Sequence, residues 1–200
     1  MATNPILIQV GRGDIYIDVP VPVVPPVPLN VDGSPATGGR FIGSTLDAAS
    51  LIYRPTTFDI KTQQSTGNVG YVTVEEDLRI EFHPGELSYE NLRDLTISRL
   101  DQGQFISLGG IIFPQFKSCL LVAPRRAGGF ISAMIYQCVF AEDRSWGFAR
   151  AAHQDARVAA RALALTTRNF GDQLGYYHPN TPFGTPAAPA FPDNIAKPTL

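Results

Sequence analysis

Proline is concentrated in two segments of this chain and restricts what those segments can form. Six of the 17 prolines lie in residues 20–35, and six more lie in residues 178–200. Each proline fixes its own φ angle and removes one N–H donor, so we expect neither a regular helix nor an inner strand there. The chain therefore divides into a domain over residues 1–178, which includes a Pro/Val-rich arm at 20–35, and a Pro/Ala-rich tail at 179–200.

The arm contains the run PVPVVPPVPLNV, in which proline alternates with valine. This pattern favours an extended, polyproline II-like backbone. A solvated linker would be more polar, so two placements stay open. The arm either lies over the surface of its own domain or lies on a neighbouring subunit.

Between the two proline-rich segments the hydrophobic pattern has mostly period two. Leu78, Ile80 and Phe82 alternate with charged residues, which predicts one long strand over residues 69–82 with one buried face. Phe58 and Ile60 also alternate with polar residues, and a polar stretch follows at 63–68. The two segments together predict a long hairpin with a projecting tip.

A second hairpin is expected from two runs that are apolar on both faces. These runs are Phe116 to Ala123 and Phe130 to Ala141, and the turn sequence PRRAGG separates them. Cys119 and Cys138 would lie on these strands. Two cysteines are too few for a disulfide scaffold, so we interpret them as reduced core thiols.

One helix is predicted from Leu87 to about Arg99, covering an end or edge of the sheets. Ser88 is a suitable N-cap, and Leu92 and Leu95 share one face. The segment 148–168 is ambiguous, because its alanine content favours a helix while Val158, Ala160 and Ala162 also permit strand alternation.

Composition excludes several classes of protein. The chain has 200 residues, 44% of them hydrophobic, so it can close a substantial core. Its formal net charge of -2 and its 17% of charged residues argue against a generic cationic nucleic-acid binder. No apolar run approaches the roughly 18 residues needed to span a bilayer, and the first residues lack the pattern of a secretory signal. We therefore expect no membrane insertion by this chain.

The sequence contains no pattern typical of an enzyme. A G-x-S-x-G motif is absent, and the three histidines, His83, His153 and His178, are scattered. Adjacent acids such as Glu75 and Glu76 would point to opposite faces of a strand and would not converge on one ion. We therefore expect no catalytic residues, no metal site and no cofactor.

Charge is unevenly distributed along the chain. Residues 75–101 contain eight acids and three arginines, whereas residues 125–168 contain seven arginines and three acids. Two interpretations stay open. On opposite surfaces these regions would be complementary head to tail, as in rings or filaments. Within one subunit they would neutralise each other.

The segment from Gly43 to Leu95 resembles the core of phage tail tube (major tail) proteins. The resemblance rests on the order of four elements: Ile42-Gly43-Ser44-Thr45, then FDIKTQQ at 58–64, then DLRIEF at 77–82, then Glu90-Asn91-Leu92 on a helix. With Arg157 to Gly175 included, it covers about a third of the chain. The arm and the tail depart from the simplest members of that family.

The resemblance implies a mainly β fold, a β-sandwich or barrel with one short flanking α-helix, whose subunits join into a shared inner β-barrel. Six subunits would form a ring, and stacked rings would form a hollow conduit for ejection of viral double-stranded DNA into the host cell. The chain would be assembled in the host cytoplasm and belong to the virion tail, with the tail sheath, tape measure, terminator and baseplate proteins as further partners. The family pattern also favours a strand over a helix for residues 157–167.

Candidate residues follow from this resemblance and from charge. A lumen should be neutral or acidic, because a basic one would grip DNA through counterion release. The acids that are candidates for facing the lumen are Asp59, Glu75, Asp77 and Glu81. Subunit or ring contacts are expected from the tip, residues Thr62, Gln63, Gln64, Ser65, Thr66, Gly67 and Asn68. Salt-linked ring stacking is expected from Arg125, Arg126, Arg157 and Arg161.

Two other classes of function are retained as alternatives. One is another β-rich virion component, such as a tail terminator, a neck or baseplate-hub protein, or a capsid decoration protein. The other is a monomeric ligand-binding β-barrel. Polymer length separates the first alternative from a tube subunit, and a monodisperse species of about 22 kDa would indicate the second.

Overall fold

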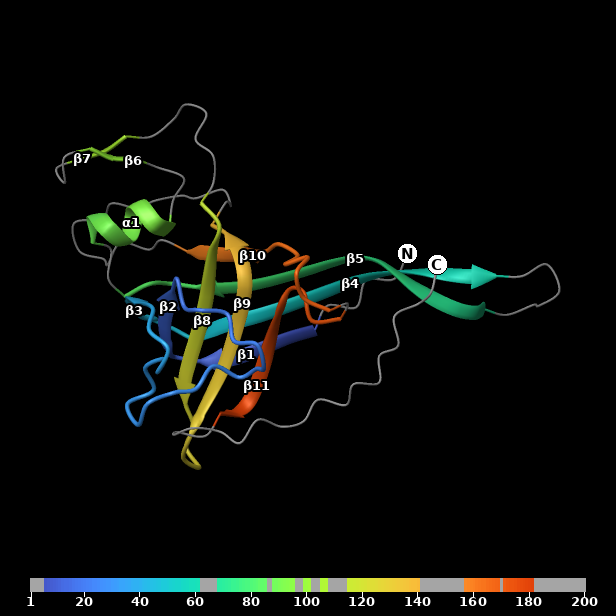
Figure 1. The fold of residues 1–200 in the computed structure, drawn as a ribbon, viewed down its shortest axis with the longest axis horizontal. Coiled ribbons are helices and arrows are strands. Elements are labelled where there is room, and N and C mark those ends of the chain that lie inside the picture. The colour runs from blue at the N-terminus through green and yellow to red at the C-terminus, as the bar shows by residue number, and fades with distance from the viewer. Residues whose placement is uncertain are drawn as a thin grey trace.

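The chain is mainly β in the computed structural model, which describes residues 6–61, 68–85, 88–95, 99–101, 105–107, 115–140, 157–169 and 171–181 (Figure 1). Eleven strands and one helix are found in these ranges. The elements are β1 (Ile6–Gly11), β2 (Asp14–Ile17), β3 (Arg40–Ser44), β4 (Ala49–Lys61), β5 (Asn68–Phe82), α1 (Tyr89–Leu95), β6 (Arg99–Asp101), β7 (Phe105–Ser107), β8 (Lys117–Pro124), β9 (Phe130–Val139), β10 (Val158–Ala162) and β11 (Gly175–Thr181).

Nine of the described strands form one antiparallel sheet that is not closed within the chain. Its order is β1-β4-β5-β10-β9-β8-β2-β3, and β11 pairs with β9 outside this path. The mainly β class predicted from the sequence is confirmed, whereas the chain by itself does not complete a barrel. Strands β6 and β7 form a separate two-stranded sheet.

A common core lies on the inner face of the curled sheet. The alternation predicted for β5 is confirmed, since Leu78, Ile80 and Phe82 are 7%, 0% and 2% exposed. They share one apolar cluster with Ile17 of β2 and Ile135 of β9, from the other half of the sheet. Each such side chain contributes about 1.5–3 kcal/mol by burial, so this cluster holds the two halves together.

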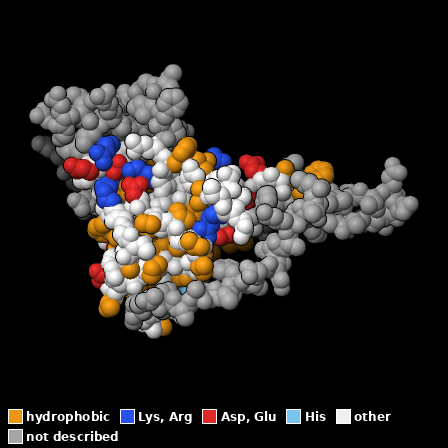
Figure 2. All heavy atoms as spheres, viewed as in Figure 1, with side chains coloured by type: hydrophobic (Ala, Val, Ile, Leu, Met, Phe, Trp, Pro, Cys, Tyr) orange, Lys and Arg blue, Asp and Glu red, His pale blue; other side chains and the backbone are white. Residues whose placement is uncertain are grey.

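The predicted inner hairpin is confirmed as β8 and β9, buried on both faces. Its second face carries Leu120 and Met134, which pack against Val27 and Leu29 of the proline-rich arm. The arm therefore lies over its own domain, which is the first of the two placements that the sequence permitted. Figure 2 shows apolar side chains gathered over this part of the molecule.

The helix begins at Tyr89, two residues after the predicted start at Leu87, and it also ends earlier than predicted. The Ser88 hydroxyl accepts a hydrogen bond from the Asn91 amide at 3.2 Å, the geometry of an N-cap. The helix ends at Leu95, which is fully buried, and Arg99 already belongs to β6. The predicted extension to Arg99 was therefore wrong. The side-chain amide of Asn91 donates to the Ile42 carbonyl at 2.6 Å and ties α1 to β3.

Two further segments differ from the expected pattern. Val158–Ala162 is a strand, as the family resemblance favoured, but residues 163–167 leave the sheet. Strands β1, β2 and β11 were not predicted from the sequence. Strand β11 continues to Thr181 and includes Pro179, which is compatible with its place at an edge of the sheet.

Candidate assembly interface

The β4–β5 hairpin projects beyond the strands that flank it, as Figure 1 shows. Strand β1 pairs with β4 only as far as Tyr53, and β10 pairs with β5 only from Arg79 to Phe82. Beyond these points, residues 54–61 of β4 and 68–77 of β5 pair only with each other among the described strands. We call this two-stranded part the ribbon. Within the described residues, neither of its outer edges is paired with another strand.

One face of the ribbon is apolar and exposed to solvent. Phe58 and Val72 are directly opposite each other, with 57% and 49% of their side chains exposed, and Val74 is 66% exposed. A two-stranded ribbon is marginally stable by itself, and an exposed apolar stripe beside open strand edges favours association. The ribbon thus combines open strand edges with an exposed apolar face, which are the two features of a sheet that lacks neighbouring strands.

Three of the proposed lumen acids lie on the face of β5 that is turned away from the core. Because Leu78, Ile80 and Phe82 point into the core, Glu75, Asp77 and Glu81 point away from it. The fourth, Asp59, lies opposite Tyr71 in the ribbon, and its side chain is outside the described part of the structure. Sequence reasoning could not assign this parity, because it depends on which face the rest of the sheet covers.

The acids on the outer face of β5 form ion pairs with arginines of the same chain. Asp77 accepts hydrogen bonds from Arg79 at 2.7 Å and from Arg161 of β10 at 3.2 Å. Glu81 pairs with Arg157, which immediately precedes β10. These acidic and basic regions therefore meet inside one subunit, which is the second interpretation of the uneven charge. Both arginines remain at least half exposed.

The remaining predicted contact residues lie at two separate places. Asn68 begins β5 and pairs with Lys61, while the rest of the tip, residues 62–67, is outside the described residues. Arg125 and Arg126 lie in the turn between β8 and β9, far along the chain from the ribbon. The Arg125 guanidinium donates a hydrogen bond to the Asn180 side-chain oxygen of β11. The structure does not bring this turn together with Arg157 and Arg161.

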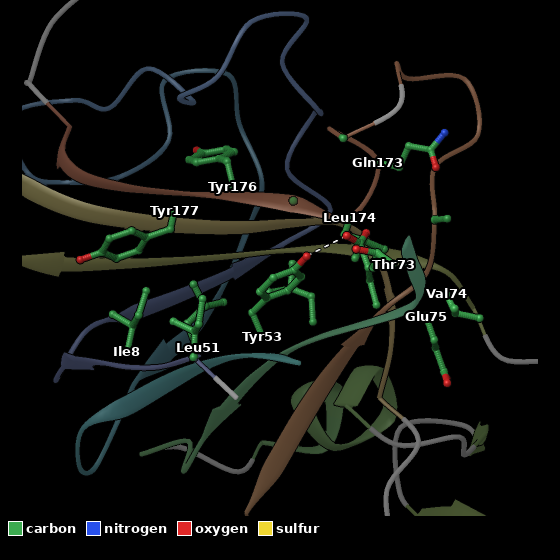
Figure 3. Close-up of a pocket in the computed structure, with 16 residues that line it drawn as sticks. Ile8, Leu51, Tyr53, Thr73, Val74, Glu75, Gln173, Leu174, Tyr176 and Tyr177 are labelled. Atoms are coloured by element: carbon green, nitrogen blue, oxygen red, sulfur yellow. Dashed lines mark hydrogen bonds between the residues drawn. The ribbon is translucent and has the colours of Figure 1, made fainter. Parts of the chain in front are cut away.

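A pocket of about 760 Å³ opens at the base of the ribbon (Figure 3). It lies beyond the part of β5 that pairs with β10. Residues 73–76 and Leu78 of β5 line one side, and residues 173–177 line the other. Ile8, Leu51 and Tyr53 point into it from β1 and β4, as Figure 3 shows. The Tyr53 hydroxyl donates to Glu76 at 2.7 Å, and burial together with this bond raises the pKa of Tyr53 to about 12.

A polar clamp holds the arm, and the sequence analysis missed it. The Arg168 guanidinium donates to the Pro22 carbonyl at 2.7 Å, pairs with Asp172, and lies 4.2 Å from the centre of the Tyr136 ring. The Val27 amide donates to the Tyr176 hydroxyl at 2.8 Å. Pro22 and Arg168 are 146 positions apart, and Val27 and Tyr176 are 149 positions apart, so no local pattern indicates these two contacts.

The described residues contain no group of three or more His, Cys, Asp or Glu side chains arranged to hold a metal ion. Cys119 and Cys138 are buried and free, in agreement with the predicted core thiols. Burial raises the pKa of both thiols, so both are protonated at neutral pH. None of the helices in the described ranges is long and apolar enough to cross a bilayer.

Comparison with models of known protein families and with curated protein sequences gives no match to this chain.

Proposed function

We propose that this chain is a structural subunit of a bacteriophage tail tube. Its subunits assemble into hexameric rings, the rings stack, and the ribbons of neighbouring subunits join into a shared inner β-barrel that conducts DNA. The observation that carries the proposal is the ribbon, whose two edges and apolar face have no partner among the described residues. Copies of the same chain would supply the missing neighbours, and closure of the barrel would remove the open edges.

The two edges of the ribbon are not equivalent. Pro55 lies in β4 two residues beyond the last residue paired with β1, and it has no N–H to donate. The edge of β5 between Asn68 and Leu78 contains no proline. The β5 edge is therefore the better acceptor of another strand. In a ring, the β5 edge of one subunit would face the β4 edge of the next, a heterologous contact that can close.

The charges on the outer face of β5 and β10 suit a surface along which DNA passes. Duplex DNA is gripped when cationic side chains displace its condensed counterions. Here Arg157 and Arg161 are paired with Glu81 and Asp77, and Glu75 adds a further exposed negative charge. Positive and negative charges nearly balance, which supports passage of DNA without tight binding.

The proposal is tested by removing the apolar face of the ribbon. We expect the purified chain to form stacked tubes in negative-stain micrographs, and the double variant Phe58→Ser/Val72→Ser to remain at about the 21.7 kDa of one chain by light scattering. Because these side chains are about half exposed in the single subunit, the variant should retain its fold, which circular dichroism can verify.

A matched control variant also loses two exposed apolar side chains, but at positions outside the ribbon. Phe116→Ser/Val31→Ser removes two side chains that are 58% and 81% exposed and lie outside the ribbon. This variant should still form tubes. A wild-type chain that stays a single 21.7 kDa species would contradict the proposal, and isolated rings without stacks would favour a terminator, neck or baseplate component instead.

Ring stacking has a separate electrostatic test at the β8–β9 turn. Reversal of charge in Arg125→Glu/Arg126→Glu should shorten the tubes or leave single rings, because like charges would then meet across the stack. Tube length is measured in micrographs at low and at physiological salt. If the tubes keep their length at physiological salt, these arginines do not take part in the stacking contact.

A further inference from the structure

The two ends of the nine-stranded sheet differ in what lies against them. Strands β1 and β3 are the terminal strands, and each pairs with only one neighbour among the described strands. A terminal strand presents unpaired N–H and C=O groups to which a strand of another molecule can add. On β1, Ile6 and Leu7 are 52% and 59% exposed. At β3, in contrast, α1 lies beside the end of the sheet, as Figure 1 shows.

The side chain of Asn91 gives β3 a partner with the chemistry of a peptide group. Its amide nitrogen donates to the Ile42 carbonyl at 2.6 Å, and its oxygen accepts from the Arg40 guanidinium at 3.0 Å. Asn91 is buried, so these bonds are shielded from water. The Ser44 carbonyl accepts a hydrogen bond from the Gly85 amide at 2.8 Å. Two carbonyls of β3 are thus bonded to residues that belong to no strand of the sheet.

Ion pairs and burial hold α1 in this position. Asp94 of α1 is 4% exposed and pairs with Arg40 of β3 and with Lys117 of β8. The next residue, Leu95, is fully buried in the core. The helix has only seven residues, and an isolated helix of this length is not stable in water. These tertiary contacts therefore determine where α1 lies.

We propose that α1 is an edge cover, which blocks the pairing of β3 with β3 of a second copy of this chain. Strand β3 contains no proline and carries the half-exposed Phe41, so an uncovered edge would favour pairing. An identical strand can pair with it antiparallel about a two-fold axis. The cover leaves association of copies to the open edges elsewhere in the sheet. This inference concerns one helix and one edge, and it does not depend on the tail tube proposal.

Removal of the anchors of α1 tests the proposal in a chain that lacks the apolar face of the ribbon. The background carries Phe58→Ser/Val72→Ser, and the test variant adds Asn91→Ala/Asp94→Ala, which keeps the helix propensity of α1 high. We expect the background to keep the 21.7 kDa mass of one chain in light scattering. The test variant should approach twice that mass as its concentration rises.

A spin label locates the contact between copies. A nitroxide at Phe41→Cys stands on a face of β3 and leaves the edge free, and the native thiols of Cys119 and Cys138 are buried. Paired strands lie about 5 Å apart, so the labels of two copies joined at β3 should broaden each other's spectrum. An excess of unlabelled test variant should remove the broadening.

A control variant separates uncovering of β3 from a general loss of stability. Leu120→Ala in the labelled background removes a fully buried side chain under the arm and leaves the contacts of α1 intact. This control should show no spectral broadening. The broadening is the deciding measurement even if the background associates, because contact at another edge does not bring two β3 strands together.

Two results would overturn the inference. The first is a folded test variant, checked by circular dichroism, whose spectrum is not broadened, since α1 would then not be what blocks β3. The second is equal broadening in Leu120→Ala, since loss of stability alone would then expose the edge. If the test variant does not fold, Asn91→Ala is measured alone in the same background. It should show weaker broadening that rises with concentration, and an unbroadened spectrum would overturn the inference.

Discussion

The β8–β9 hairpin and the β4–β5 ribbon are made of similar strands but differ in what covers them. On the β8–β9 hairpin, Leu121 and Ile135 face the core, while Leu120 and Met134 face the arm. On the ribbon, Phe58 and Val72 have no described neighbour that buries them. Among the described residues, the chain covers one hairpin on both faces and leaves the other open. The open hairpin is the one that we propose is completed by other copies of the chain.

The largest expected contrast between the two hairpins is in the free energy of unfolding. Leu120→Ala should destabilise the single subunit by about 2–5 kcal/mol, because it leaves a cavity under the arm. Val72→Ala should change stability by less than about 0.5 kcal/mol, because the side chain is half exposed. Urea titrations at low protein concentration, where assembly does not contribute, measure both. Equal losses would mean that the ribbon is buried within its own subunit.

A second contrast with the exposed ribbon is found at Asp94, a buried carboxylate that is paired with cations of the same subunit. Asp94 is 4% exposed and pairs with Arg40, Arg93 and Lys117. Burial alone would raise its pKa, but the Arg93 hydrogen bond and the charges of Lys117 and Arg40 outweigh burial, so the pKa is lowered. Asp94→Asn should cost about 2 kcal/mol by leaving these cations without their counter-charge.

The sign of this pKa shift fixes the pH dependence. Because the folded-state pKa of Asp94 lies below the unfolded value, its contribution is fully present above the unfolded pKa of about 3.9 and is lost as pH falls towards the folded pKa. The difference in stability between wild type and Asp94→Asn should therefore shrink below about pH 4. If this difference in stability stays constant from pH 7 to pH 3, the negative charge of Asp94 does not account for it. Asp47→Asn, at an exposed pair with His83, serves as the control and should change stability little.

A smaller loss of stability than at Leu120 or Asp94 is expected at the contact that fixes the arm on the β8–β9 hairpin. Tyr176→Phe removes the hydroxyl that accepts the Val27 amide and should cost about 1 kcal/mol. Hydrogen exchange should become faster at the Val27 amide while the amides of β8 keep their protection. An unchanged exchange rate at Val27 would show that burial of its side chain alone holds the arm.

Local patterns predicted the parts of the fold in which burial alternates along one strand. The alternation of Leu78, Ile80 and Phe82 identified β5, and Ser88 identified the start of α1. The short strands were missed, because β2 has only four residues and β11 contains a proline and a bulge, so neither presents a full period of alternation. The family resemblance, rather than alanine propensity, gave the correct state for Val158–Ala162.

The candidate site was predictable in outline but not in orientation. The polar tip and the long hairpin follow from the sequence, whereas the facing of Glu75, Asp77 and Glu81 depends on long-range packing of the sheet. Arg157 pairs with Glu81, which is 76 positions away in the sequence. The distribution of charge along the sequence could not show whether such pairs form within one subunit or between subunits. The exposed Phe58 and Val72 were visible only once their cross-strand partners were known.

The contact between the Val27 amide and the Tyr176 hydroxyl also sets an order of events during synthesis. The ribosome releases the arm early, but the residues that fasten it emerge about 150 positions later. Until then, the arm over Leu120 and Met134 lacks the hydrogen bonds from Arg168 and Tyr176, and the nascent chain is exposed to premature association. A chaperone that engages this chain would therefore act in the interval between the emergence of Met134 and that of Tyr176.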